Sequence, residues 1–180
     1  MRIGVFDSGI GGVNVLSSLI KKYPHNEYIY FGDTINLPYG NKSKEELFIL
    51  ASQAIDFLLT KNVDIIIIAC GTISSNCYYE LKEKYHLPLY DIVSPTKRYL
   101  EKSSYHNIGV IGTKKTIASK IFNILNKNVL MHATPSLVPI IESNTIEENE
   151  QSILADLERF RKYDVACIKT FLFKKLKILL

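Results

Sequence analysis

Cys70 is the residue whose type and position best suit acid–base chemistry in this chain. It follows residues 63–69, an apolar run without polar alternation, which predicts a strand buried on both faces. Residues 73–85 after it are predicted to be helical. A thiol between a strand end and a helix N-terminus lies where α/β sheets bind ligands and where the thiolate is favoured. The alternative is a small buried hydrophobe, and position alone leaves both interpretations open.

Asp7 and Ser8 open a second candidate segment. They follow the apolar residues 2–6 and precede a glycine-rich stretch that ends at Gly12. Such glycines let backbone N–H groups approach an anion at a helix N-terminus, although a tight turn is the plain alternative. Asn14 stands where a dinucleotide fingerprint needs its third glycine, so that fingerprint is excluded. A carboxylate at a strand end often binds a substrate ammonium group or adjusts a neighbour's proton affinity.

The second half of the chain offers weaker candidates. Thr113 and Thr116 follow the apolar run 107–111 and provide hydroxyls at a strand end. Glu142 follows a turn at Pro139, and Cys167 has only two apolar residues before it. Cys77 is interpreted as packing. The cysteines and the four histidines show no metal-ligand spacing, so we predict no metal site.

Composition excludes several function classes. Of 180 residues, 47% are hydrophobic and 22% charged, which is typical of a globular protein, and the formal net charge is only +4. Lysines are scattered rather than clustered, which argues against a nucleic-acid partner. No apolar stretch is long enough to span a membrane. Three cysteines without a secretory signal predict reduced thiols in the cytoplasm.

Strand and helix patterns alternate along the chain and predict an α/β fold with parallel sheets. Ser43 and Glu46 form a capping-box signature for a helix over 44–59. The strand–turn–helix theme starts again after residue 95, so we expect units over 1–95 and 96–165, then a segment over 166–180. The two units are expected to face a central cleft. Further strands are predicted at 27–31, 87–93 and 129–132, and further helices at 96–104, 116–125 and 147–162.

Six motifs in order resemble the glutamate racemases, which belong to the cofactor-independent aspartate/glutamate racemases. They cover residues 3–142 and read IGVFDSGIGG, YFGDT, PYGNKS, ACxT, IGVIGTxxT and PxLVPxxE. The resemblance implies two Rossmann-like units and inversion of glutamate without a cofactor, to supply D-glutamate for peptidoglycan. The implied partner is the small-molecule substrate. Removal of a weakly acidic α-proton suits a thiol held on each face of the substrate.

The resemblance also assigns residues. It implies that Cys70 is one catalytic thiol and Asp7 its helper, and that Cys167 is the opposite thiol with Glu142 as its helper. The remaining positions that match the family's motifs would line the glutamate site, and they are Ser8, Tyr39, Gly40, Gly71, Thr72, Thr113 and Thr116.

Several positions depart from the family pattern. Gly71 replaces an Asn expected to hold the substrate. After Cys167, the family's Thr, His and Pro are replaced by Ile168, Lys169 and Phe171, and the spacing from Glu142 to Cys167 is shorter. Two alternatives to the active racemase therefore stay open. One is an inactive remnant that still binds an amino acid, and the other is a racemase of another substrate such as aspartate or a hydantoin.

The chain end also differs from the family, whose members continue with a segment that completes the first unit. We expect a chain truncated at its C-terminus, with an incomplete second unit and apolar surface left exposed. Aggregation, low stability or a swapped homodimer would follow. The tail 171–180 is interpreted as core that lacks its partner, with an amphipathic surface helix as the alternative.

Overall fold

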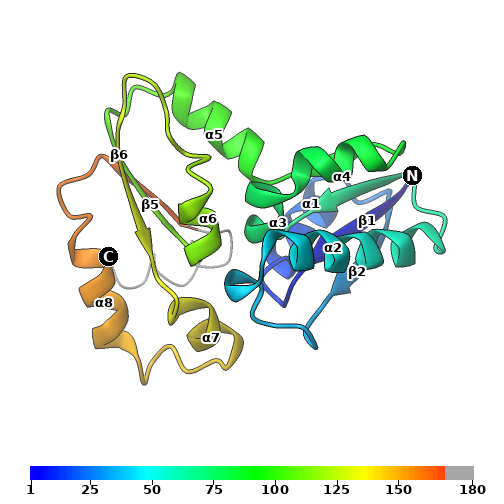
Figure 1. The fold of residues 1–180 in the computed structure, drawn as a ribbon, viewed down its shortest axis with the longest axis horizontal. Coiled ribbons are helices and arrows are strands. Elements are labelled where there is room, and N and C mark those ends of the chain that lie inside the picture. Colours follow the sequence, from blue (N-terminus) through cyan, green and yellow to red (C-terminus); the bar gives the residue numbers. More distant parts are fainter. Residues whose placement is uncertain (169–180) are drawn as a thin grey trace. The chain divides into compact units, whose positions relative to one another are not determined.

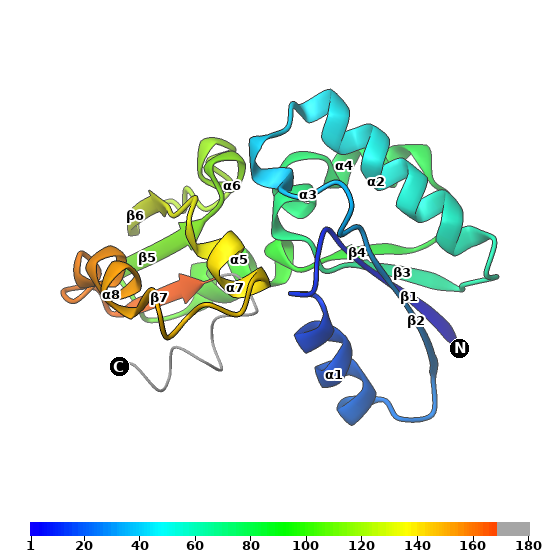
Figure 2. The ribbon, with the colours of Figure 1, turned by 90° about the horizontal axis from the view of Figure 1, so that it is seen from below.

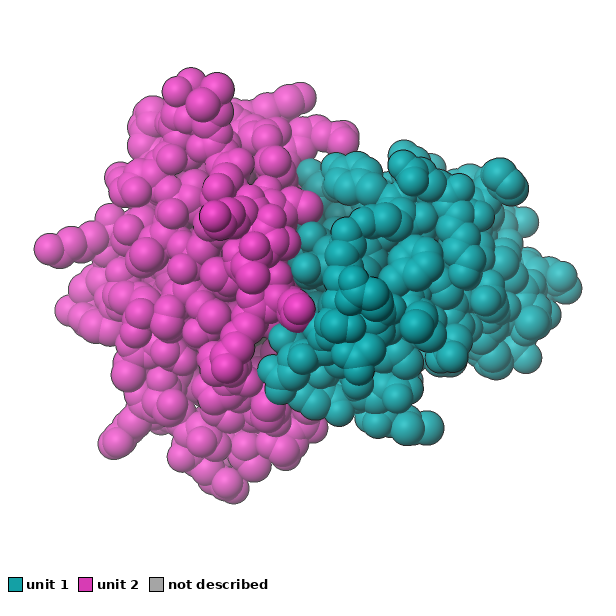
Figure 3. All heavy atoms as spheres, viewed as in Figure 1, with its two compact units in different colours: residues 1–94 teal, residues 95–180 magenta. Residues whose placement is uncertain are grey.

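The structure, a computed structural model, describes residues 1–168, with the backbone alone for 165–168. The predictions for residues 169–180, including the apolar tail, lie outside the described residues. The chain divides into two compact units, Met1–Ser94 and a second that begins at Pro95 (Figure 3). Each is built on a parallel sheet, which confirms the predicted α/β class (Figure 1).

Unit 1 contains a four-stranded parallel sheet. Its order is β2-β1-β3-β4, so the N-terminal strand lies inside the sheet. Phe6 of β1 pairs with Phe31 on one side and with Ile68 on the other. The strands are β1 (Arg2–Asp7), β2 (Glu27–Gly32), β3 (Ile65–Ile68) and β4 (Leu89–Asp91).

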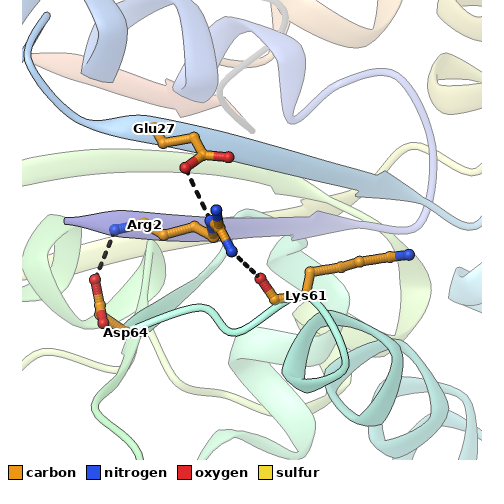
Figure 4. A network of polar contacts seen from close by, with 4 residues as sticks. All are labelled: Arg2, Glu27, Lys61 and Asp64. Atoms are coloured by element: carbon orange, nitrogen blue, oxygen red, sulfur yellow. Dashed lines mark hydrogen bonds and ion pairs between the residues drawn. The ribbon is translucent and has the colours of Figure 1, made fainter.

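Arg2 ties the start of β1 to its neighbours (Figure 4). Its backbone N–H donates to Asp64 Oδ2 over 2.6 Å, and the Asp64 N–H donates back to the Arg2 carbonyl over 2.8 Å. The Arg2 guanidinium donates to Glu27 Oε2 at 2.9 Å and to the Lys61 carbonyl at 2.8 Å. These bonds align the first residues of three strands and therefore help to set the register at their far ends.

Helices cover the two faces of this sheet unequally (Figure 2). One face carries α1 (Val13–Lys22), and the other carries α2 (Lys44–Leu59), α3 (Gly71–Asn76) and α4 (Tyr78–Lys84). The main core forms on the second face, where Leu47, Ile55 and Leu58 of α2 pack with Phe6 and Ile68.

The prediction that β3 is buried on both faces is wrong for one of them. Ile66 and Ile68 are fully buried, but Ile65 and Ile67 are only half-buried on the α1 side. The physical reason is that α1 is a single helix of ten residues, none of which is buried, whereas several helices cover the opposite face.

Local hydrogen bonds set the start of α2 and the end of α3 in unit 1. The Ser43 hydroxyl accepts from the Glu46 N–H at 3.1 Å and the Glu46 carboxylate accepts from the Ser43 N–H at 2.7 Å, so the predicted capping box and helix 44–59 are confirmed. The single helix predicted over 73–85 is wrong, because Cys77 leaves helical geometry at φ −127°. Ser75 and Asn76 side chains bond back to the Thr72 carbonyl, which competes with helix continuation.

Unit 2 contains a three-stranded parallel sheet in the order β6-β5-β7. Its strands are β5 (Asn107–Gly112), β6 (Asn128–Ala133) and β7 (Val165–Ile168). Ile111 packs with Leu137, Ile153 and Leu157 in its core. The glycine at 109 lets the Phe160 ring lie directly against β5, where a β-carbon would collide with it.

The helices of the second half differ from the predicted ranges. They are α5 (Val93–Lys102), α6 (Lys114–Ala118), α7 (Leu137–Glu142) and α8 (Glu150–Glu158). Helix α5 begins before Pro95 because the Asp91 carboxylate accepts hydrogen bonds from the Val93 and Ser94 N–H groups. Helix α6 ends at Ala118, before the predicted end at residue 125, and Lys120 after it adopts a left-handed φ of 53°. Pro139 lies in the first turn of α7, where proline is tolerated, rather than in a turn of its own.

No helix among the described residues is long and apolar enough to cross a membrane. Nor do those residues contain a group of three or more His, Cys, Asp or Glu side chains arranged to hold a metal ion.

Removal of the capping box should measurably destabilise unit 1. We expect Ser43→Ala to lower the free energy of unfolding by about 1 kcal/mol, because the Glu46 N–H loses its acceptor. Urea unfolding measures this. Thr60→Ala is the control, because the Thr60 hydroxyl is exposed and bonds to the Phe57 carbonyl of its own helix. Equal losses in the two variants would contradict the account.

Candidate functional site

The end of β1 and the segment after β3 bring Asp7, Ser8 and Cys70 to one edge of the sheet. The Ala69 N–H donates to the Phe6 carbonyl at 2.7 Å, which extends the β1–β3 pairing by one residue. The Cys70 thiol then donates to Ser8 Oγ over 3.3 Å. Two segments 62 residues apart in sequence therefore meet at this sulfur.

Asp7 is held by the glycine-rich turn that follows it. Its Oδ2 accepts the Gly12 N–H at 2.7 Å, and the side chain is 1% exposed. A β-carbon at position 12 would lie 2.7 Å from Asp7 Cβ, so the close approach requires glycine. Tyr30 donates its hydroxyl to the Gly9 carbonyl at 2.5 Å and fixes the same turn. The turn thus serves to orient a carboxylate beside the strand end.

Cys70 is the N-cap residue of α3 and is completely buried. Its carbonyl accepts the Ser74 N–H at 2.9 Å, the first bond of the helix. Gly71 and Thr72 follow it and are buried as well. A proton donor or acceptor in such surroundings is shielded from bulk water.

Tyr39 lies near this cluster, in the 3-10 helix η1 (Tyr39–Asn41) that also contains Gly40. Its side chain is 2% exposed, and its hydroxyl donates to Asp33 Oδ2 at 2.6 Å. Burial raises the pKa of the Tyr39 phenol far above its usual range, and the bond to Asp33 and the charges of Cys70 and Asp7 raise it further. The phenol therefore stays neutral and keeps its proton for donation.

Asp33 is a residue that the sequence reasoning did not single out. It follows β2 and is 9% exposed. The available signal was its position, because a carboxylate directly after the end of a parallel strand meets the ends of neighbouring strands.

The predicted site residues of unit 2 form a smaller arrangement. Thr113 caps α6, where its hydroxyl oxygen accepts the Thr116 N–H at 3.2 Å and lies 3.1 Å from the Thr116 hydroxyl oxygen. Both threonines are buried. Glu142 is half-buried at the last position of α7. Their part in a glutamate site stays a prediction.

Cys167 differs from Cys70 in its place along the sheet. Asp164 stands before β7 as Asp64 stands before β3: its carboxylate accepts the Asn107 N–H at 2.8 Å, and its own N–H donates to the Asn107 carbonyl at 2.9 Å. Cys70 comes six residues after Asp64, whereas Cys167 comes only three residues after Asp164. Cys167 pairs with Val110 inside the sheet. The residue that the resemblance implies as the second catalytic cysteine thus lies within the backbone pairing of β5 with β7.

Comparisons with known proteins agree on one family of relatives. No family model matches the chain. The glutamate racemase of Aquifex aeolicus is 39% identical over 82% of this chain and 60% of its own length. Glutamate racemase 3 of Caldanaerobacter subterraneus subsp. tengcongensis is 36% identical over 98% of this chain and 63% of its own length. The chain therefore spans about three fifths of these curated relatives.

Solved structures give the same result. Glutamate racemase from Aquifex pyrophilus superimposes with a TM-score of 0.80 at 32% identity, over 98% of this chain and 75% of that protein. The enzyme from Francisella tularensis, solved in complex with D-glutamate, gives 0.84 at 30% identity, over 99% of this chain and 73% of that protein. An aspartate racemase from Picrophilus torridus shares the fold at 16% identity.

Cys77 should make the stability of unit 1 fall in alkali. Burial, and next the Glu80 charge, raise the pKa of its thiol from 9.0 to about 12. Because the unfolded thiol titrates first, the stabilisation is complete below pH 9 and is lost as the pH rises towards 12. Between pH 8 and 10.5 we expect wild type to lose about 1–2 kcal/mol more than Cys77→Ala.

Urea unfolding at the two pH values measures this difference. Thr60→Ala removes no titrating group and should keep the wild-type dependence on pH. Identical pH dependence in wild type and Cys77→Ala would show that the Cys77 thiol ionises as easily in the folded protein as in the unfolded chain.

Proposed function

Since this chain belongs to the glutamate racemase family, we propose that it interconverts the enantiomers of glutamate with Cys70 as one acid–base group. The observation that carries the proposal is the meeting of the Cys70 thiol with Ser8, 3.3 Å apart and next to Asp7, at the carboxyl edge of a parallel sheet. The relative from Francisella tularensis, solved with D-glutamate, supports the choice of substrate.

The proposed chemistry is a proton transfer at the α-carbon. Thiolate sulfur takes the α-hydrogen as a proton, an S–H bond forms, and the C–H electron pair stays on a carbon flanked by the substrate carboxylate. A second acid on the opposite face then protonates that carbon, which completes inversion. Buried donors stabilise the intermediate charge because they are already oriented. No cofactor is needed for these steps, and the D-glutamate formed would serve peptidoglycan synthesis in the cytoplasm.

A second candidate function is proton exchange, or binding, without inversion. The observation that favours it is the place of Cys167, which pairs with Val110 within β7, whereas Cys70 lies two residues beyond the end of β3. In this second function no group acts on the opposite face of the substrate. Such a protein would exchange the α-proton of one enantiomer with solvent and leave its configuration unchanged.

Deuterium exchange tests the role of Cys70. In deuterated water, we expect wild type to exchange the α-proton of glutamate, and Cys70→Ala to be slower by about 10²–10⁴-fold because the base is absent. Proton NMR of the α-position measures this. Cys77→Ala is the matched control, since it also truncates a buried cysteine of unit 1 and should keep the wild-type rate. Exchange by Cys70→Ala at the wild-type rate would refute the assignment.

The same reactions separate the candidate functions when the products are resolved on a chiral column. Exchange with inversion of both enantiomers supports the racemase. Exchange of one enantiomer without inversion supports the one-sided site. Aspartate in a parallel reaction tests the alternative substrate that the absence of a side chain at Gly71 leaves open. Faster reaction of aspartate than of glutamate would overturn the substrate assignment.

A further inference from the structure

Asp33 connects the end of β2 to the end of β1. Its backbone N–H donates to the Asp7 carbonyl at 3.0 Å. The backbone of Asp33 is therefore fixed beside that of Asp7. This main-chain bond is independent of the side chain and would survive a substitution of Asp33.

The Asp33 carboxylate is saturated by the loop that follows it. Oδ2 accepts the Tyr39 hydroxyl at 2.6 Å and the Asn36 side-chain amide at 2.9 Å. Oδ1 accepts the same amide at 2.9 Å and the Asn36 backbone N–H at 3.4 Å. Because both oxygens already accept hydrogen bonds from protein groups, the carboxylate is suited to hold this loop rather than to exchange protons with a substrate.

Tyr39 links the Asp33 carboxylate to the candidate site. The phenol is buried beside the Asp33 carboxylate, and Tyr39 belongs to the same cluster of packed buried residues as Cys70. The Lys42 N–H donates to the Tyr39 carbonyl at 3.2 Å, so the whole turn η1, with Gly40, follows the position of Tyr39.

We propose that Asp33 is a positioning residue that fixes the Tyr39–Asn41 turn beside Cys70 and thereby sets the affinity for the substrate. The proposal rests on the proposed function, because the turn matters only where glutamate binds near Cys70. Asp33 itself carries out no step of the reaction. Its loss should weaken substrate binding more than it slows proton transfer.

Kinetics of paired variants test the proposal. Asp33→Ala and Tyr39→Phe should each raise KM by about tenfold, with a smaller change in kcat, because a hydrogen bond to a charged group is lost. The double variant should be no worse than Asp33→Ala alone, since Tyr39→Phe removes only a bond that Asp33→Ala has already removed. Asp33→Asn keeps an acceptor for the Tyr39 hydroxyl and should recover part of the affinity.

The chain provides a matched control in the same unit. The Tyr85 hydroxyl donates to Asp56 Oδ1 at 2.7 Å, another tyrosine–aspartate bond that joins the end of α4 to α2. Tyr85→Phe and Asp56→Ala should leave KM unchanged. A rise in KM in these controls equal to that in the Asp33 variants would show a general loss of stability and overturn the proposal.

Amide hydrogen exchange gives a readout that needs no activity. The Lys42 N–H should exchange faster in Asp33→Ala and Tyr39→Phe than in wild type, and remain unchanged in Tyr85→Phe. Unchanged exchange at Lys42, a wild-type KM, or additive effects in the double variant would each overturn the proposal. If wild type neither binds nor converts glutamate, the proposed function fails and the affinity claim with it, while faster exchange at Lys42 would still identify Asp33 as the anchor of the turn.

Discussion

The parallel pairing of β1 with β3 is the constraint on which the candidate site depends. It places Phe6 opposite Ile68, so the residues that follow each strand leave the sheet at the same edge. Asp64 and Arg2 fix the opposite ends of these strands through a pair of hydrogen bonds. A slip of one residue would turn alternate side chains to the other face and separate the Cys70 sulfur from Ser8. The backbone register of β1 and β3 thus determines which side chains meet at this edge.

Unit 2 has the same aspartate–backbone bonds between two strands, but its cysteine lies at a different position along the strand. Asp164 aligns β7 with β5 as Asp64 aligns β3 with β1, and Ile168 pairs with Ile111. Within that alignment the cysteine at 167 falls inside the strand. The two cysteines that the resemblance assigns to opposite faces of the substrate therefore occupy different backbone positions relative to their strands. This asymmetry is the structural basis for weighing inversion against one-sided exchange.

Much of the fold could be predicted from the sequence because local signals decide it. The Ser43 capping box gives the start of α2, and apolar runs before Asp7 and Cys70 give β1 and β3. The glycine-rich stretch after Asp7 indicates either backbone N–H groups that approach an anion or a plain tight turn. In the structure one of those groups binds Asp7 itself.

The errors arise where side chains compete with the helix backbone or where contacts are remote in sequence. Ser75 and Asn76 bond back to the Thr72 carbonyl and the helix breaks at Cys77, which no periodicity of apolar residues reveals. The role of Asp33 is not visible in the sequence pattern because its partner Tyr39 lies in an irregular loop. Hydrogen bonds within such loops produce no periodic pattern in the sequence. Position at a strand end, however, would have identified it.

The central claim is that the sulfur at position 70 contacts the substrate. Selective ¹³C labelling of cysteine β-carbons allows each thiol to be followed by NMR during titration with D-glutamate. The account predicts that the Cys70 resonance shifts and reaches saturation while that of Cys77, a packing residue with a strongly raised pKa, stays in place. A Cys70 resonance that remains unmoved while glutamate binds would contradict it.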